Sequence, residues 1–284
     1  MIVINIDPVL LTIAGHPLVR WYGLMYVVGI LVGLWIAIPY GRARGLSEDN
    51  IWSIFWPAAI AGLVGARLYY VAQSDPLSYL PQPWRIFATW EGGMAFYGAV
   101  FGALIAIAYV CWRRKIDFWR VLDMAAIFAV VGQSFGRIGN IINGDILGYP
   151  TNLPWGFIYV NPNSFAPVKG IAYQPAAVYE LLFNIVFFIV LWKLRFRFKS
   201  SGMLFATWLI GYSIGQFLIF FVRDNVVLYF GLKQAQLTAI VVLLLCVPLV
   251  LYLRSRNVGR GQGEDEQPQS GQVSEGVGEP HGLT

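Results

Sequence analysis

A group of polar residues lies at one end of an apolar stretch of the chain. Residues 136–148 contain an arginine (Arg137), two asparagines (Asn140 and Asn143) and an aspartate (Asp145) among aliphatic residues. Charged and amide side chains are costly inside a lipid bilayer, and where they occur they usually mark a functional site. A guanidinium group binds carboxylates and phosphates through paired hydrogen bonds. The segment therefore predicts a binding site for an anionic ligand, and a phosphate group suits it best.

The spacing of these residues places them together on a helix. Gln133, Arg137, Asn140 and Gly144 are four, three and four positions apart, so they would share one helical face. The neighbouring stripe consists of the glycines Gly132, Gly136 and Gly139. Small residues let a second helix approach closely, which would shield the polar face from lipid. We therefore expect the guanidinium and the amides to point into one cavity between helices.

The elements that must hold this cavity are membrane helices. The chain is 57% hydrophobic and only 12% charged, whereas soluble domains contain roughly 25% charged residues. Runs of about 20 apolar residues predict helical spans. They occur at residues 19–39, 50–72, 94–112, 120–142, 176–194, 202–222 and 236–254. The predicted fold is all-α, a polytopic integral membrane protein with about seven transmembrane helices.

Basic residues predict the orientation of these spans, because cytoplasmic loops retain Lys and Arg. Of the twenty Lys and Arg residues, thirteen fall on the side that holds the C-terminus, four on the other side, and three within or at the edge of spans. We therefore expect an outward N-terminus and a cytoplasmic C-terminus. With this topology, the polar segment around Arg137 faces the outer side.

The chain is expected to divide into a membrane domain, residues 1–254, and a tail, residues 255–284. The tail is rich in Gly, Gln, Glu and Ser, and has almost no apolar residues to bury. Such a composition is typical of disorder, so we predict a disordered cytoplasmic tail.

Several classes of chemistry lack the residues they need. The chain has only two cysteines and two histidines, and no metal-binding motif or phosphate-cradling glycine loop is present. We therefore expect no metal and no cofactor. A retinal photoreceptor would need a lysine in the last span, and residues 236–254 contain none.

Four further residues at outer helix ends are candidates for binding a lipid headgroup. Tyr22 and Tyr97 open the first and third spans, Arg67 lies near the end of the second, and Arg223 follows the sixth. Tyrosines at these positions are also common interfacial anchors, and arginines there often extend to the interface for structural reasons. Both interpretations remain open for each of the four.

At these residues the chain resembles a known family, the prolipoprotein diacylglyceryl transferases. The most specific match is the segment from Gly136 to Asp145, followed by Gly148 and by Pro150-Thr151-Asn152-Leu153-Pro154-Trp155-Gly156. Supporting matches are Arg20-Trp21-Tyr22-Gly23, Gly65-Ala66-Arg67, Glu91-Gly92-Gly93-Met94-Ala95-Phe96-Tyr97-Gly98 and Gln174-Pro175-Ala176-Ala177-Val178-Tyr179-Glu180. Together these motifs cover nearly the whole membrane portion.

The resemblance implies an enzyme of the bacterial inner membrane with its active site facing outward. Such an enzyme would transfer the diacylglyceryl group of phosphatidylglycerol to the lipobox cysteine of a prolipoprotein, the first step of lipoprotein maturation. The products would be a thioether and glycerol 1-phosphate. The implied partners are phosphatidylglycerol, prolipoproteins and membrane lipids, with no nucleic acid.

The expected catalytic residues are Arg137 and Asn140, which would stabilise charge on the leaving phosphate, and Tyr97. The expected substrate-binding residues are Arg137, Tyr22, Arg67, Asp145, Gly148 and Arg223. Arg137 has a structural alternative, in which it pairs only with a helix-end carbonyl or with Asp145. Glu180, near the outer end of the fifth span, is expected to pair with an arginine and to orient it.

The chain departs from the family pattern at two places. Many relatives have histidine where Tyr97 stands, proposed there as the base that activates the thiol. A phenol with its ordinary pKa near 10 is a poor base at neutral pH, so the base stays open between Tyr97 and Asp145 or Glu180 acting with water. In the sixth span, Gln216 and Phe220 replace an arginine and a glutamate, which suggests the joint removal of an ion pair.

A lipid-binding or transport protein without catalysis is the alternative function. An arginine in a glycine-lined cavity would also suit an anion pathway. Transporters often contain two related halves with broken helices, and no convincing repeat is present in this sequence. The transferase is therefore the preferred prediction.

Overall fold

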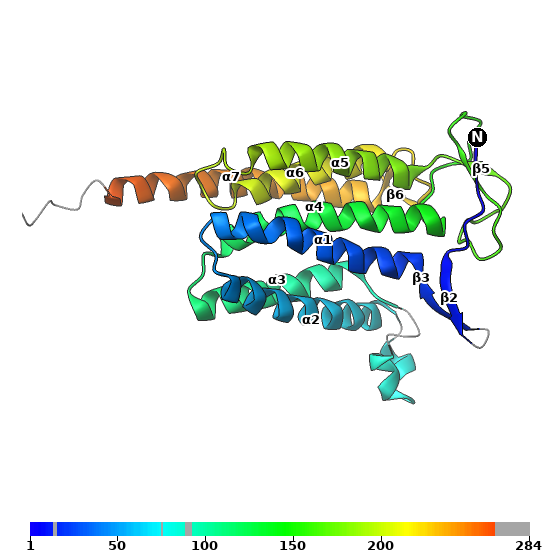
Figure 1. Ribbon diagram of the computed structural model, residues 1–284, viewed down its shortest axis with the longest axis horizontal. Coiled ribbons are helices and arrows are strands. Elements are labelled where there is room, and N and C mark those ends of the chain that lie inside the picture. The colour runs from blue at the N-terminus through cyan, green and yellow to red at the C-terminus, as the bar shows by residue number, and fades with distance from the viewer. Residues whose placement is uncertain (14–15, 75, 89–92, 265–284) are drawn as a thin grey trace, which may run out of the picture.

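The computed structural model describes residues 1–13, 16–74, 76–88 and 93–264, and seven α-helices run side by side along its long axis (Figure 1). They are α1 (Trp21–Ala43), α2 (Glu48–Gln73), α3 (Phe96–Arg114), α4 (Phe118–Asn143), α5 (Ala176–Leu194), α6 (Met203–Ile219) and α7 (Gln234–Glu264). All seven predicted spans are found as helices, with ends shifted by a few residues. The exception is the end of α7, which continues past the predicted boundary at residue 254.

The helices have the composition of membrane spans. In the described part of the chain, six are long and apolar enough to cross a bilayer, and α6 is a shorter apolar helix of 17 residues. The prediction of a polytopic helical membrane protein is therefore confirmed. Ten residues of the predicted tail lie in α7, and residues 265–284 lie outside the described residues, so the disordered tail stays a prediction.

Helix α4 is the centre of the bundle. It packs against α1, α5 and α6, while α2 pairs with α3 and α6 with α7. The main core contains Ile127, Val130 and Val131 of α4 together with Phe187 and Leu191 of α5. The helix that carries the polar segment is thus covered from several sides, as a membrane helix with charged residues must be.

The glycine stripe of α4 is partly used as predicted. A Cβ on Gly139 would lie 3.0 Å from the Cα of Tyr22 in α1, and one on Gly29 of α1 would lie 3.4 Å from the Cα of Gly132. By contrast, a Cβ on Gly132 or on Gly136 would meet nothing within 4 Å. The stripe therefore allows close packing with α1 and also leaves space beside α4.

The start of α6 is fixed by a side chain of α4. The buried carboxylate of Asp123 accepts hydrogen bonds from the backbone N–H groups of Gly202 (2.7 Å) and Phe205 (2.9 Å). These groups have no partner within their own helix, and a carboxylate is a preferred partner at a helix N-terminus. This contact sets the position of α6 along α4, and hence of the α6 residues that reach the site.

Short strands that the sequence did not predict cover the end of the bundle at which α4 finishes (Figure 1). A three-stranded sheet joins β1 (Ile2–Ile4), β4 (Phe157–Tyr159) and β5 (Ala172–Tyr173), with β1 parallel and β5 antiparallel to β4. The other elements are the antiparallel pairs β2 (Val9–Ile13) with β3 (His16–Arg20) and β6 (Val227–Tyr229) with β7 (Leu232–Lys233), and the 3₁₀ helices η1 (Pro76–Tyr79) and η2 (Pro83–Phe87).

The long segment after α4 is anchored to that helix. Gly144 ends α4 with a φ of 74°, a conformation that glycine adopts easily. The hydroxyl of Tyr159 in β4 donates to the carbonyl of Ile141 (2.7 Å), and the amide of Phe165 donates to the carbonyl of Asn143 (2.8 Å). Burial raises the pKa of Tyr159 above its ordinary value, so this phenol stays neutral and keeps donating its hydrogen bond.

Candidate functional site

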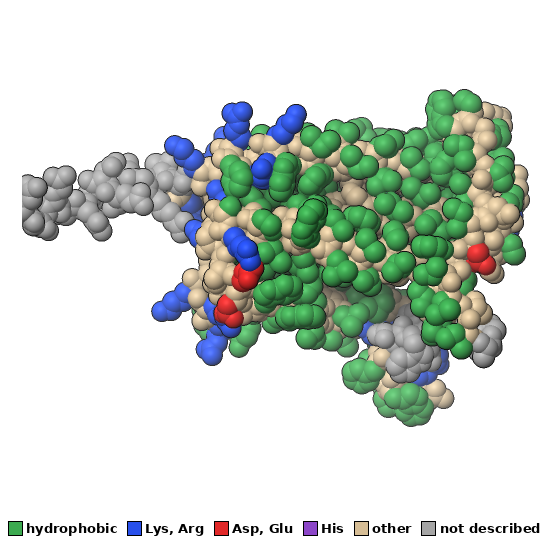
Figure 2. Space-filling view, in the orientation of Figure 1, with side chains coloured by type: hydrophobic (Ala, Val, Ile, Leu, Met, Phe, Trp, Pro, Cys, Tyr) green, Lys and Arg blue, Asp and Glu red, His purple; other side chains and the backbone are tan. Residues whose placement is uncertain are grey.

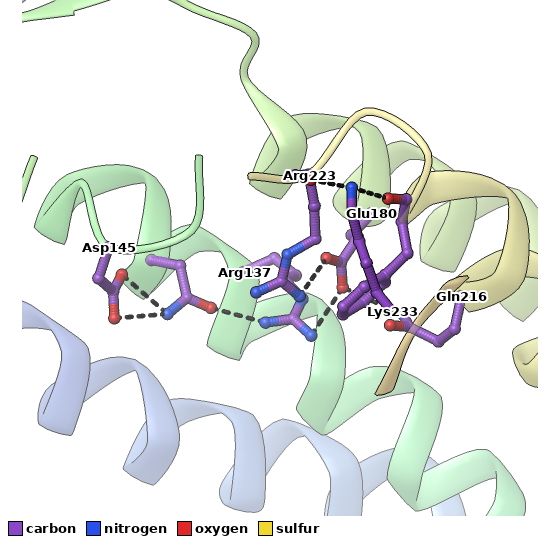
Figure 3. Close-up of polar contacts among 8 residues, drawn as sticks. Arg137, Asp145, Glu180, Gln216, Arg223 and Lys233 are labelled. Carbon is purple, nitrogen blue, oxygen red and sulfur yellow. Dashed lines mark hydrogen bonds and ion pairs between the residues drawn. The ribbon is translucent and has the colours of Figure 1, made fainter. Parts of the chain in front are cut away.

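The carboxylate of Glu180 is the centre of a buried polar cluster (Figure 3). Glu180 lies in α5 and is 1% exposed. Its Oε2 forms an ion pair with Arg137 Nη2 of α4 (2.7 Å) and accepts a hydrogen bond from Gln216 Nε2 of α6 (3.2 Å). Its Oε1 accepts a hydrogen bond from Arg223 Nη1 (3.3 Å). Three separate segments therefore meet at one carboxylate. The expectation that Glu180 pairs with an arginine is confirmed.

A chain of hydrogen bonds links this cluster to Asp145. Arg137 Nη1 donates to Asn140 Oδ1 (2.9 Å), and Asn140 Nδ2 donates to Oδ1 (3.1 Å) and Oδ2 (3.2 Å) of Asp145. Asn140 is buried, whereas Asp145 is exposed. In this arrangement Asn140 stands between the arginine and the aspartate, and it orients both.

The cluster has unused capacity to bind an anion. The Nε atoms of Arg137 and Arg223 are buried and have no hydrogen-bond partner within the described residues. Buried donors without partners are rare and costly. Two guanidinium groups also share the single carboxylate of Glu180, so an incoming anion would meet an excess of positive charge and free donors.

Backbone pairing positions Arg223. The amide of Tyr149 donates to the carbonyl of Val222 (3.1 Å), and the amide of Asp224 donates to that of Leu147 (3.2 Å). Gly148 lies between these bonds, and a Cβ there would come within 2.4 Å of the Val222 carbonyl oxygen. The structure therefore shows Gly148 as a point of close backbone approach, and its predicted role in substrate binding stays a prediction.

Two more side chains support the same turn. Lys233 is 4% exposed, and its Nζ donates to the carbonyls of Phe220 (2.6 Å) and Arg223. The guanidinium of Arg223 lies 4.3 Å from the centre of the Phe220 ring. Burial lowers the pKa of Arg223, and the nearby Glu180 carboxylate opposes this effect. Because arginine starts from a very high pKa, it stays charged.

The structure brings both predicted tyrosines toward the cluster. The hydroxyl of Tyr22 is 2.9 Å from that of Tyr26 in the same helix, and Tyr22 lies close enough to interact electrostatically with Asp145 and Arg137. The hydroxyl of Tyr97 donates to Thr238 Oγ1 of α7 (3.4 Å). Their catalytic and binding roles stay predictions.

Tyr212 of α6 lies near both Tyr97 and the cluster. Tyr212 lies within electrostatic range of Tyr97, Arg137, Glu180 and Arg223. Sequence reasoning missed this residue, although it lies four positions before Gln216 and therefore on the same face of α6.

Arg67 binds backbone carbonyl groups outside the Glu180 cluster. Its guanidinium donates to the carbonyls of Ile86 (2.8 Å), Arg85 (2.6 Å) and Gly93 (3.1 Å). The structure thus joins Arg67 to the segment that connects α2 with α3, which favours the structural interpretation left open by the sequence. The neighbouring motif residues Glu91 and Gly92 lie outside the described residues.

Comparisons with known proteins show the family of this chain. The sequence profile of the family described as prolipoprotein diacylglyceryl transferase matches residues 8–252. A phosphatidylglycerol–prolipoprotein diacylglyceryl transferase of Geobacter sulfurreducens is 35% identical, over 78% of this chain and 83% of its own length. Proteins of the same name from Thermosynechococcus vestitus (32% identity, 81% and 87%) and Cupriavidus pinatubonensis (32%, 90% and 94%) are also similar. The chain, with its arginines gathered around one buried carboxylate, belongs to the prolipoprotein diacylglyceryl transferase family.

Proposed function

We propose that this protein transfers the diacylglyceryl group of phosphatidylglycerol to the lipobox cysteine thiol of a prolipoprotein. The thiol sulfur forms a bond to the glyceryl carbon that carries the phosphate. The bond from that carbon to the phosphate oxygen breaks, and glycerol 1-phosphate leaves with the bonding electrons. The thiol proton passes to a base or to water. The observation that carries the proposal is the pair of arginines with free buried Nε donors at Glu180.

The arginines fit the charge that this reaction develops. The phosphate of the lipid is a diester, and as a monoester leaving group it gains negative charge. Donors that are already fixed around this charge stabilise the transition state without reorganisation. In the proposed mechanism Arg137 and Arg223 bind the phosphate, while Asn140 holds Arg137 in place.

The proton of the thiol needs an acceptor. Glu180 already accepts two hydrogen bonds from side chains and forms an ion pair with Arg137, whereas the exposed Asp145 accepts only from Asn140 among the side chains described. We therefore propose Asp145, acting directly or through water, as the acceptor, with Tyr97 as a hydrogen-bonding group for the substrate.

The proposed location is the bacterial inner membrane, with the site facing outward. Lys and Arg gather at the end of the molecule from which α7 extends, opposite the sheet (Figure 2). Because cytoplasmic ends retain basic residues, this distribution supports a cytoplasmic C-terminus. Arg137 and Glu180 would then lie toward the outer leaflet, where translocated prolipoproteins become accessible.

The test is turnover by the purified, detergent-solubilised protein with phosphatidylglycerol and a lipobox peptide. Release of glycerol phosphate should depend on the thiol and should fall at least about 100-fold in Arg137→Ala, because a fixed donor to the developing charge is lost. Arg113→Ala is the matched control, since Arg113 is an exposed arginine at the C-terminal end of α3, away from the Glu180 cluster. Folded wild-type protein that binds the lipid without releasing glycerol phosphate would instead indicate a non-catalytic lipid-binding or transport protein.

A further inference from the structure

A second set of unpaired polar groups lies one and two helical turns from the Glu180 cluster. The indole Nε1 of Trp208 in α6 and the amide Oε1 of Gln133 in α4 are buried and have no hydrogen-bond partner within the described residues. Polar groups at this depth normally find partners, so their common location requires an explanation.

These residues share the faces that carry the cluster. Gln133 precedes Arg137 by four positions, and Trp208, Tyr212 and Gln216 follow each other at intervals of four, which keeps each set on one face of its helix. The rings of Trp208 and Tyr212 stack, with centroids 5.6 Å apart. A continuous row of polar groups therefore leads from Glu180 down α6.

The rows on the two helices also lie at matching depth. Arg137 and Gln216 bind the same oxygen of Glu180, and both lie near the C-terminal ends of their helices, next to the start of α5. Helices α4 and α6 thus run in the same direction and pack together. Going one turn back toward the middle of the bundle reaches Gln133 on one helix and Tyr212 on the other, and a second turn reaches Trp208.

Open space lies beside α4 at the glycines that precede Gln133 and Arg137. Gly136 is buried, yet a Cβ on it, or on Gly132, would meet nothing within 4 Å. The side chains of the row offer hydrogen-bond donors. These are the indole N–H of Trp208, the phenol O–H of Tyr212 and the amide of Gln133, which can turn either its oxygen or its NH₂ group toward a ligand. Among groups that enter a membrane, ester carbonyls are acceptors that match these donors.

We propose that Trp208, Tyr212 and Gln133 form a subsite for the ester linkages of the diacylglyceryl group, an inference that rests on the proposed function. With its phosphate at Arg137 and Arg223, a phospholipid has its ester carbonyls only a few covalent bonds deeper in the bilayer. One helical turn rises about 5.4 Å, so these carbonyls fall at the depth of the row. The subsite holds the group that is transferred and fixes the glyceryl carbon toward the thiol.

The test compares phosphatidylglycerol with a diether analogue that has the same headgroup and chains but no ester carbonyls. Wild-type protein should prefer the diester in both equilibrium binding and kcat/KM. Trp208→Phe and Tyr212→Phe keep the stacked rings but remove one donor each. Each variant should lose about three- to ten-fold on the diester, as expected for one hydrogen bond, and should be unchanged on the diether.

The matched control is Tyr40→Phe, because the hydroxyl of Tyr40 is also buried and unpaired within the described residues but belongs to α1 and lies outside the row. It should leave the preference for the diester unchanged, and a thermal melt should show that all variants fold. Equal losses on both lipids, or no preference in the wild type, would overturn the subsite. Preferential binding without turnover would support the subsite and refute the proposed transferase.

Discussion

At the scale of single residues, the site depends on one buried carboxylate with three donors. Glu180 is bound by Arg137, Arg223 and Gln216. A buried charge is tolerated only when it is paired and hydrogen-bonded, and removing one partner typically costs about 3–5 kcal/mol. A neutral amide, Gln216, is the third partner of this carboxylate, and Arg223 supplies the second positive charge.

The family resemblance leads us to expect an arginine at position 216 and a glutamate at position 220, and introducing both tests whether this ion pair was lost as a unit. Gln216→Arg alone would bring a third guanidinium to Glu180, so its unfolding temperature should fall. Adding Phe220→Glu places a carboxylate under Arg223, whose guanidinium now lies on the Phe220 ring. The double variant should fold as well as the wild type and turn over at the same rate or faster.

Thermal unfolding and glycerol phosphate release, measured on both variants, test whether the arginine and the glutamate were lost together. A double variant that is as unstable as Gln216→Arg would contradict the joint loss of an ion pair, because the added carboxylate would then not compensate the added cation.

At the scale of elements, α4 and α6 are placed by contacts that are far apart in sequence. Asp123 fixes the start of α6 against α4. At the other end, the turn after α6 pairs with residues 147–149. The two arginines reach one carboxylate because both ends of α6 are fixed in this way.

Gly148→Ala should disrupt the backbone pairing between residues 147–149 and the turn that carries Arg223. Its Cβ would come within 2.4 Å of the Val222 carbonyl oxygen and 2.8 Å of the Gln174 Cβ, and such overpacking costs about 1–3 kcal/mol. Since the turn must move, we expect at least a roughly ten-fold fall in kcat/KM, measured by glycerol phosphate release.

The control for this prediction is Gly23→Ala in α1, where a Cβ would meet nothing within 4 Å. This variant should keep its activity and gain slightly in helix propensity. Full activity of Gly148→Ala would mean that the backbone contact does not position Arg223.

At the scale of the whole molecule, charge and apolar surface are arranged along the long axis. The face of the bundle shown in Figure 2 is largely apolar, and Lys and Arg gather at the end from which α7 extends. A bilayer would cover the apolar belt, and the basic end would face the cytoplasm and anionic headgroups.

Reporter fusions test this orientation. Green fluorescent protein fused after Thr284 should fluoresce, because it folds in the cytoplasm, and alkaline phosphatase at the same position should be inactive. Alkaline phosphatase inserted after Val168, in the long segment between α4 and α5, should be active, since that segment is expected outside. The reverse pattern would contradict both the topology and the outward site.

The sequence by itself determined the class of fold and the position of the site along the chain. Long apolar runs allow few alternatives to membrane helices, because every backbone polar group must be satisfied within the bilayer. The polar segment at the end of α4 was recognisable because a charged side chain such as Arg137 is costly inside a bilayer. Regular spacing also predicted which residues of α4 share a face.

Only the tertiary structure decided which partners these residues have. Glu180, Gln216 and Arg223 are far from Arg137 in sequence and meet it through the packing of three segments. The structure likewise separated Arg67, bound to loop carbonyls, from Arg223, although the sequence treated both as equal candidates. The pairing of β1 with β4 joins segments that are far apart in sequence, and no local periodicity predicts it. Local patterns fix helices and faces, whereas contacts across the bundle depend on how those faces pack.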